Sequence, residues 1–233
     1  MVSYPPDFLL DRLLYRDGLI LVVDKPAGLP VHAGPGGGPN LEEFLDALRF
    51  GLPAPPFLAH RLDRDTSGCL VLGRHKKALR RLGKLFESGA VEKVYWAVVE
   101  GRMAEDEGRI DQPLVKRSTK ARGWWMEPAP AGEGRRAVTD YRVLARGEDR
   151  SLVECRPRTG RTHQLRVHLA GLGHPIRGDA VYGTKGPGEG LLLHAKSLGL
   201  PLYPTRPPLL IEAALPERFA AALAGLEMPP AGL

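Results

Sequence analysis

The strongest constraint on the fold is a series of short apolar runs, each of strand length, that outnumber the helical patterns. Strand-like runs cover residues 19–24, 68–73, 91–99, 137–145, 151–156, 191–195 and 209–213. Helical spacing is confined to residues 41–48, 75–88, 163–172 and 216–226. Because the two kinds of element do not alternate regularly, the pattern predicts an α+β fold. We expect a mainly antiparallel, mixed β-sheet with flanking helices.

Three local signals refine this expectation. Asn40, followed by Glu43, can cap the helix that ends near residue 48. Thr162 can cap a later helix, on which one apolar stripe is expected from Leu165, Leu169 and Leu172. The polar stretch at 102–136 is long for a loop, and we therefore expect it to contain a hairpin.

The length allows one large domain or two small ones, and because no internal repeat or linker divides the chain we expect a single domain over residues 1–233 and a soluble protein. No run approaches the roughly 18 apolar residues that a membrane span needs. The two cysteines, Cys69 and Cys155, are too few for a disulfide framework or a four-cysteine zinc site, so we expect a cytoplasmic protein. No exposed apolar stripe stands out, which favours a monomer.

Charge points to a polyanionic partner. The net charge is +6, and 24 arginines stand against 9 lysines. Arginine's planar fork suits phosphate and base recognition, although a compositional bias of the genome explains the ratio alone equally well. The clustering of basic residues in the middle of the chain is the stronger indication of nucleic acid.

Two polar clusters could carry chemistry. Residues 60–68 (HRLDRDTSG) crowd charged and imidazole groups before a buried strand, either as a self-satisfied turn or as a cleft that carries a reactive carboxylate. Residues 156–166 contain four arginines, which form either a solvated basic face or a cationic partner for such a carboxylate. Residue types alone do not rank Asp63 against Asp65.

Rival chemistries are less favoured. His60, Asp63 and Asp65, or His163 and His168, resemble metal ligands, but neighbouring arginines would repel a cation, and we expect no metal. Ser67 or Cys69 could be a nucleophile, yet no G-x-S-x-G motif occurs. The sequence also lacks the glycine-rich phosphate and dinucleotide motifs, so we expect no cofactor.

HRLDRDTSG at 60–68 and GRTHQLRVHL at 160–169 resemble the two large motifs of the RluA-type RNA pseudouridine synthases. The similarity extends in order to the blocks LILVVDKPAGLPVH, EKVYWAVVEG, AVTDYRVL, GHPIRGDAVYG and LLLHAKSLGL, which together span most of the chain. The resemblance implies the pseudouridine synthase catalytic fold and isomerisation of uridine to pseudouridine without a cofactor or metal. The pattern starts near residue 14, so we expect no N-terminal S4 domain.

The resemblance also implies residue roles. Asp63 matches the essential aspartate, Tyr95 the tyrosine that stacks on the uracil, and Arg166 the arginine that pairs with the aspartate. Arg61 matches the arginine that fills the gap left by a flipped nucleotide, and Leu193 an apolar residue beneath the base. His60 and Thr66 beside them are either substrate contacts or scaffolding of the loop.

The expected partner is ribosomal or transfer RNA. Three basic regions could bind it: the helix at 75–88, the segment 116–122 with Trp124 and Trp125, and the arginines at 156–161. Two other readings stay open. One is a noncatalytic RNA-binding or chaperone protein that retains the fold, and the other is a metal-dependent RNA hydrolase.

Overall fold

The computed structural model describes residues 4–34, 37–121, 123–184 and 190–227. They form two compact units: residues 1–93 with 195–214, and residues 94–194 with 215–233. The chain passes between the units at 93/94, 194/195 and 214/215. The expectation of one domain over residues 1–233 stays a prediction.

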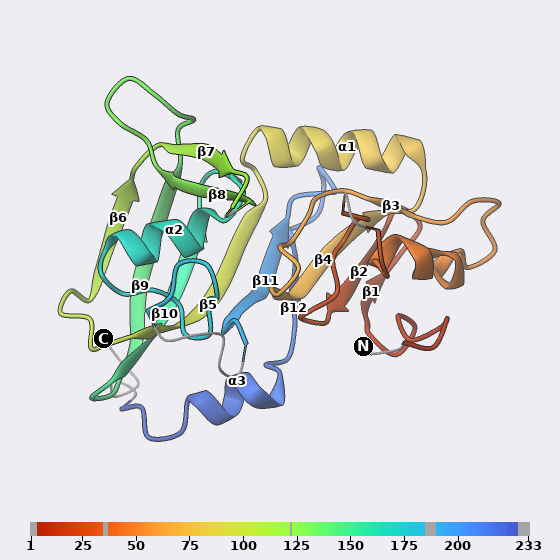
Figure 1. The fold of residues 1–233 in the computed structure, drawn as a ribbon. Helices are drawn as coiled ribbons and strands as arrows, with labels where there is room; N and C mark the ends of the chain where they lie inside the picture. The colour runs from red at the N-terminus through yellow and green to blue at the C-terminus, as the bar shows by residue number, and fades with distance from the viewer. Residues whose placement is uncertain (1–3, 35–36, 122, 185–189, 228–233) are drawn as a thin grey trace. The chain divides into compact units, whose positions relative to one another are not determined.

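The first unit is built on strands β1 (Leu13–Arg16), β2 (Ile20–Lys25), β4 (Ser67–Gly73), β11 (Leu193–Leu200, from Ala195 on) and β12 (Leu209–Glu212), in that order (Figure 1). Short strand β3 (Phe57–Leu58) also pairs with β4. The β1–β2, β2–β4 and β11–β12 pairs are antiparallel. The Ile20–Val23 run is fully buried because β2 lies inside the sheet, with both faces covered.

Two helical elements complete the first unit. Helix α1 (Lys76–Glu87) packs Leu82 into the core formed with β2 and β4, and leaves most of its basic residues exposed. The element η1 (Leu41–Leu48) is a 3₁₀ rather than an α-helix, with Asn40 at its N-cap as predicted. The Asn40 side chain accepts a hydrogen bond from the Glu42 N–H group and donates one to Glu43.

The second unit is built on the antiparallel strands β5 (Glu92–Glu100, from Val94 on), β10 (Arg150–Pro157), β9 (Val138–Arg146) and β6 (Glu107–Asp111), in that order. Helices α2 (Gln164–Gly171) and α3 (Glu217–Ala222) belong to the same unit. Side chains of β5, β9 and β10 share a core with Leu165, Leu169 and Phe219 of the helices. These pairings confirm the α+β fold with a mainly antiparallel sheet.

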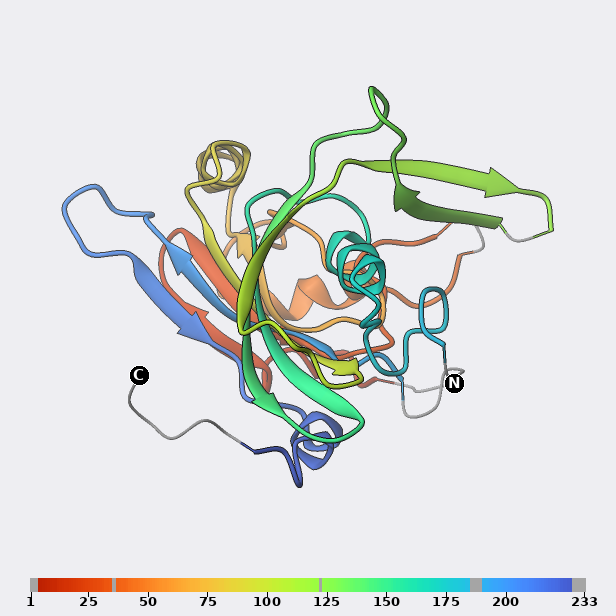
Figure 2. The same ribbon diagram turned by 90° about the vertical axis from the view of Figure 1, so that its left-hand side faces the viewer.

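The expected hairpin in the stretch 102–136 is present as β7 (Leu114–Thr119) and β8 (Gly123–Pro128). Figures 1 and 2 show that it stands apart from β6 and β9 and forms a two-stranded sheet of its own. The same stretch contains β6, which the sequence did not indicate because Ile110 is its only buried side chain.

Candidate active site

A buried lysine braces the loop that carries Asp63. Lys25, at the end of β2, has no exposed surface, and its Nζ donates to the carbonyl oxygens of Pro26, Leu29 and Arg64, each at 2.8 Å. The Gly28 N–H group donates to the same Arg64 oxygen at 3.0 Å. Three charge-assisted hydrogen bonds therefore tie residues 26–29 to the residue that follows Asp63.

Burial lowers the pKa of Lys25 to about 7. The negative charges of Asp65, Asp63 and Asp24 act in the opposite direction and favour the ammonium form. The Lys25 side chain therefore links the loop at 60–68 to the strand both by hydrogen bonds and by charge.

The turn after Asp63 is fixed by its backbone. The Thr66 N–H group donates to the Asp63 carbonyl oxygen at 3.2 Å, and Thr66 itself is buried. Gly68 follows with a φ of +104°, and a Cβ there would lie 2.3 Å from the carbonyl oxygen of Ala195. Only glycine fits this position, because the backbone of β11 lies where any side chain would begin.

The candidate functional residues of the loop at 60–68 differ in their solvent exposure. Asp63 is half-buried, whereas Arg61 and Asp65 are exposed. Arg64 is exposed too, and its ion pair with Asp65 is long, at 3.9 Å. Among the described residues, no partner forms a hydrogen bond or an ion pair with the Arg61 guanidinium, which leaves it available to a ligand.

His60 is held as part of the scaffold. Its Nε2 accepts a hydrogen bond from the Val71 N–H group at 3.0 Å, and its ring stacks on Phe86 with centroids 4.7 Å apart. Burial lowers the pKa of His60 to about 4, helped by the charge of Lys93, so the ring is neutral near pH 7. The side chain supports the loop, and a contact with substrate stays a prediction.

The described residues give little support to the rival chemistries. Burial raises the pKa of Cys69 to about 12, so its thiol stays protonated and is a poor nucleophile. Cys155 behaves in the same way. Within the described ranges, no group of three or more His, Cys, Asp or Glu could hold a metal ion, and no helix is long and apolar enough to cross a membrane.

In the second unit, Arg166 forms a buried ion pair with Asp179. The guanidinium Nε and Nη2 donate to the two Asp179 carboxylate oxygens at 2.7 and 2.8 Å, and the side chains are 7% and 0% exposed. Burial alone would raise the pKa of Asp179, but Arg166 and the N–H groups of Val181 and Tyr182 outweigh it and hold the pKa below its usual range. Arg166 is therefore fixed as a cation inside the unit.

The rest of the motif at 160–169 also holds the structure together. The Gln164 Oε1 accepts hydrogen bonds from the Thr159 hydroxyl and the Arg161 N–H group. The Gln164 Nε2 donates to the Thr139 hydroxyl and to the Val138 carbonyl oxygen. His168 contacts Thr139 and the Gln112 carbonyl oxygen through its two ring nitrogens. These polar contacts explain why the motif is polar although it lies in a buried helix.

Two details predicted for this helix are wrong. The N-cap residue of α2 is His163 rather than Thr162, because the chain turns there through the left-handed region, with a φ of +53°. The apolar stripe does not extend to Leu172, which is 40% exposed, whereas Gln164, Arg166 and His168 are buried. Hydrogen bonds to β9 and an ion pair bury these polar residues, so helical spacing of leucines does not define the buried face.

Tyr95 and Leu193 lie in the second unit with Arg166. Tyr95 is half-buried on β5 opposite Cys155 of β10, and packs against the core cluster of that unit. Leu193 is 4% exposed and belongs to that cluster, so it is a core residue whatever else it contacts. The first unit thus brings together His60, Arg61, Asp63 and Thr66, and the pairing of Asp63 with Arg166 stays a prediction.

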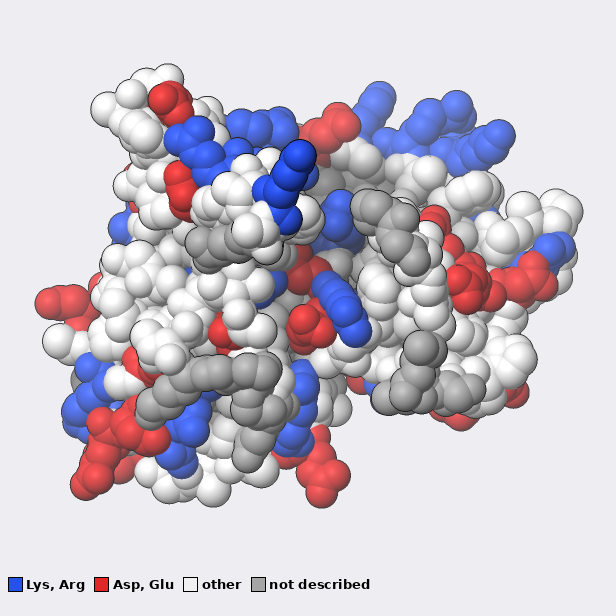
Figure 3. Space-filling model, viewed as in Figure 1, with Lys and Arg blue, Asp and Glu red and all other residues white. Residues whose placement is uncertain are grey.

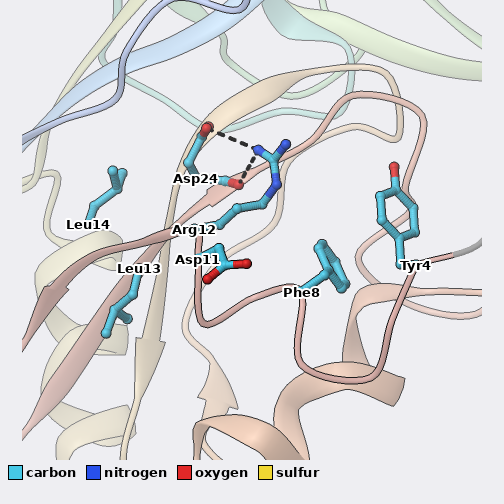
Figure 4. A pocket seen from close by; sticks show the side chains of 7 residues that line it. All are labelled: Tyr4, Phe8, Asp11, Arg12, Leu13, Leu14 and Asp24. Carbon is cyan, nitrogen blue, oxygen red and sulfur yellow. Dashed lines mark hydrogen bonds and ion pairs between the residues drawn. The ribbon is translucent and has the colours of Figure 1, made fainter.

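A pocket of about 530 Å³ lies in the first unit (Figure 4). It is lined by Tyr4, Phe8, Asp11, Arg12, Leu13, Leu14 and Asp24. Arg12 and Asp24 form an ion pair across it at 3.2 Å. None of the site residues predicted from the sequence lines this pocket, so it does not hold the predicted chemistry.

Sequence reasoning missed three residues that organise the site. Lys25, Asp179 and Tyr182 each lie in a block that resembles the family, but the sequence assigns them no role. A lysine two positions after the apolar run at 19–23 was the available signal, because the end of a buried strand predicts burial and hence a need for partners. Asp179 bonds to the neighbouring N–H groups of Val181 and Tyr182, but its ion-pair partner Arg166 lies 13 residues away. The Tyr182 hydroxyl likewise bonds to distant residues, so no local signal indicated these roles.

Comparison with known proteins adds an independent finding. Residues 19–171 match a family model described as RNA pseudouridylate synthase. The chain is 47% identical to an uncharacterized RNA pseudouridine synthase of Zymomonas mobilis, over 91% of this chain and 96% of that protein. It is 36% identical to the ribosomal large subunit pseudouridine synthase D of that bacterium, over 82% and 61%. The structure of human RNA pseudouridylate synthase domain containing 4 aligns with a TM-score of 0.81 and 31% identity, over 96% and 97%.

Proposed function

The chain belongs to the family of RNA pseudouridine synthases, and from this premise we propose that it isomerises a uridine of ribosomal or transfer RNA, with Asp63 as the reacting carboxylate. The membership confirms the resemblance found in the motifs and the expectation of an isomerase that acts on RNA. The choice of RNA is supported by one relative, whose name assigns it to the ribosomal large subunit.

In the proposed reaction, Asp63 attacks or deprotonates the target nucleoside, and the bond between C1′ and N1 breaks. The detached uracil turns against the ring of Tyr95, and C5 bonds to C1′. The C5 proton then leaves while N1 gains one, so the atoms balance without an added reactant. Arg61 enters the stack of bases in place of the extruded nucleotide.

One observation carries this proposal: Asp63 is a half-buried carboxylate in a loop whose backbone cannot easily move. Lys25 holds the carbonyl oxygen of Arg64 at 2.8 Å, and the Thr66 N–H group closes the turn onto Asp63 at 3.2 Å. A reacting carboxylate needs this combination, because it must be reachable by substrate and still keep one position.

The exposed face of α1 is the first candidate for the RNA grip. The side chains of Lys76, Lys77, Arg80 and Lys84 are exposed there and form no hydrogen bond or ion pair with any described residue. Figure 3 shows lysine and arginine side chains gathered over this helix. Such a row of unpaired cations favours contact with phosphates rather than with the protein itself.

The hairpin β7–β8 is the second candidate, and the arginines at 156–161 are weaker ones. Lys116, Lys120 and Trp124 of the hairpin are exposed, while Arg122 lies outside the described residues. Arg156 and Arg158 are paired with Glu154 and Asp140, and the Arg161 Nε donates to the carbonyl oxygen of Arg136. These internal partners leave them less available to phosphate.

The test is Asp63→Asn, compared with Asp65→Asn as a matched control in the same loop. Pseudouridine is mapped by carbodiimide labelling and primer extension on ribosomal and transfer RNA from cells that carry each variant in place of the wild type. We expect a site that is lost with Asp63→Asn and kept with Asp65→Asn, while RNA binding by purified Asp63→Asn is retained.

Each other outcome has a meaning. Equal product from Asp63→Asn would remove the role assigned to Asp63. If deleting the gene changes no site and the purified protein binds RNA without modifying it, the noncatalytic reading is favoured. Undiminished isomerisation in excess chelator, with unchanged RNA length, would remove the hydrolase reading.

The affinity for RNA should also fall steeply with added salt. An affinity that does not change with salt would contradict binding through phosphate contacts.

We further propose that the protein works as a monomer in the cytoplasm. Both cysteines are buried free thiols, which supports a reducing compartment. Light scattering coupled to gel filtration tests the oligomeric state, and fractionation of cells tests the location.

A further inference from the structure

The hydroxyl group of Tyr182 connects the hairpin β7–β8 to the start of helix α2. It accepts a hydrogen bond from the Met126 N–H group of β8 at 2.9 Å, and it lies 2.8 Å from Nδ1 of His163. The hydroxyl either donates its own proton to the His163 nitrogen or accepts a second hydrogen bond from it, according to the tautomer of the imidazole. In both cases one side chain bonds to both elements.

His163 is held in an unfavourable backbone conformation. Its φ of +53° lies in the region that favours glycine, and its side chain gives α2 no capping hydrogen bond. Its ring instead stacks on Trp124, with centroids 5.0 Å apart and planes at 30°, and meets the Tyr182 ring edge-on at 5.6 Å. A residue kept in such a conformation by several contacts indicates a constraint that serves function.

The Tyr182 ring has a second contact, with the predicted catalytic cation. The Arg166 guanidinium lies 5.2 Å from the ring centroid, within the range of a cation–π interaction. The Tyr182 N–H group also donates to Asp179, the ion-pair partner of Arg166. Tyr182 thus touches Arg166 directly and supports it through Asp179.

The hairpin face that Tyr182 holds is exposed at one end. Leu114 and Met126 anchor this face in a small core with Val167 of α2. Towards the tip, Trp124 is 46% exposed, and the Nζ of Lys116 lies 5.0 Å from its ring centroid. An exposed indole beside an ammonium group suits an unpaired nucleotide, because the base can stack while the cation meets the phosphate.

We propose that Tyr182 is a positioning residue, which presents the Lys116–Trp124 face of the hairpin to an unpaired nucleotide of the substrate RNA and holds Arg166 through the same ring. The proposal rests on the proposed function for its substrate. The Tyr182 hydroxyl positions the hairpin for RNA binding, and the Tyr182 ring holds Arg166. The two roles can therefore be separated by mutation.

The test begins with Tyr182→Phe, which keeps the ring on Arg166 and removes both hydroxyl hydrogen bonds. We expect the KM for the RNA substrate and the Kd for RNA each to rise about tenfold, while kcat changes by less than twofold. Tyr182→Leu, which also removes the ring, should lower kcat as well. Tyr15→Phe is the matched control, because it removes a hydroxyl bonded to Asp17 at 2.9 Å, and it should change neither constant.

A double-mutant cycle distinguishes positioning from general loss of stability. If Tyr182 acts through the hairpin, Tyr182→Phe should add little to the Kd of Trp124→Ala, whereas fully additive effects would overturn the proposal. His163→Asn repeats the test with a residue that tolerates positive φ but cannot stack on Trp124. Should Tyr182→Phe fold poorly, as seen by urea unfolding, the His163→Asn result decides.

The two proposals fail in different ways. If wild-type protein forms no pseudouridine in any RNA, the proposed function fails, and the Kd measurements still test the hairpin face. If wild-type protein is active and Tyr182→Phe leaves both KM and Kd unchanged, only the role of Tyr182 is refuted.

Discussion

The loop at 60–68 and the segment at 160–169 both crowd charged side chains, but they are held by opposite means. The first is braced by Lys25, all of whose hydrogen bonds go to neutral carbonyl oxygens. The second is fixed by the ion pair of Arg166 with Asp179, in which both charges are buried. The comparison shows that a buried cation can be satisfied by backbone dipoles as well as by a carboxylate.

The difference has a consequence for chemistry. Because the Lys25 ammonium donates to backbone carbonyl oxygens, it fixes the backbone of the turn that carries Asp63. The ion pair instead uses the Arg166 side chain itself, which is predicted to act in the site and whose two hydrogen bonds go to the Asp179 carboxylate. We therefore expect the second region to respond more strongly to the loss of one charge.

The largest expected effect is that of Asp179→Ala. It leaves the Arg166 guanidinium buried without its carboxylate and removes the acceptor of two N–H groups, which should cost about 3–5 kcal/mol of the free energy of unfolding. Urea unfolding measures this cost. Asp106→Ala is the control, because its ion pair with Arg146 has an aspartate side chain that is 86% exposed, and it should cost less than about 1 kcal/mol.

A smaller effect is expected from Lys25→Met, which keeps the length of the side chain without its charge. Removing the donor to three carbonyl oxygens should lower the free energy of unfolding by about 2–3 kcal/mol, and pseudouridine formation should fall because the turn at Asp63 loosens. Lys77→Met on the exposed face of α1 is the control for stability. If Lys25→Met lowered the free energy of unfolding as much as Asp179→Ala does, this would contradict the distinction between the Lys25 brace and the Arg166–Asp179 ion pair.

Much of the fold could be predicted from the sequence, because its strands carry their own signal. The run at 19–24 and the alternation at 91–99 correspond to β2 and β5, since apolar β-branched residues indicate buried strands. Strands β1 and β6 were missed because they lie at sheet edges, where few side chains are buried. Pattern reasoning finds central strands more readily than edge strands.

The candidate site was predicted less completely. The motif at 60–68 and the basic helix were visible in the sequence, but the partners that hold the site were not. Lys25 and Arg64 are 39 residues apart, and Tyr182 and Met126 are 56 apart, so only the folded chain brings them together. The position of His163 in the left-handed region is set by such tertiary contacts as well, which is why Thr162 was mistaken for the cap.

His60→Phe tests whether the first residue of the loop belongs to the scaffold. Phenylalanine keeps a ring against Phe86 but removes the acceptor of the buried Val71 N–H group, so the free energy of unfolding should fall by about 1–2 kcal/mol. The Kd for RNA, measured by filter binding, should stay within twofold of wild type. A large loss of affinity at unchanged stability would instead make His60 a substrate contact.

The smallest effect expected is a pH dependence that belongs to Lys25 alone. Because burial lowers the pKa of Lys25 to about 7, the folded state binds fewer protons than the unfolded state between about pH 7 and the ordinary lysine pKa near 10.4. The free energy of unfolding should therefore rise with pH in this window, by about 1 kcal/mol from pH 7 to 8 relative to Lys25→Met. Urea unfolding of both proteins at the two pH values gives this difference. If the free energy of unfolding changed equally with pH in both proteins, the three carbonyl oxygens would stabilise the Lys25 ammonium as well as water does. Backbone dipoles and carboxylates would then be equivalent partners for a buried cation in this fold.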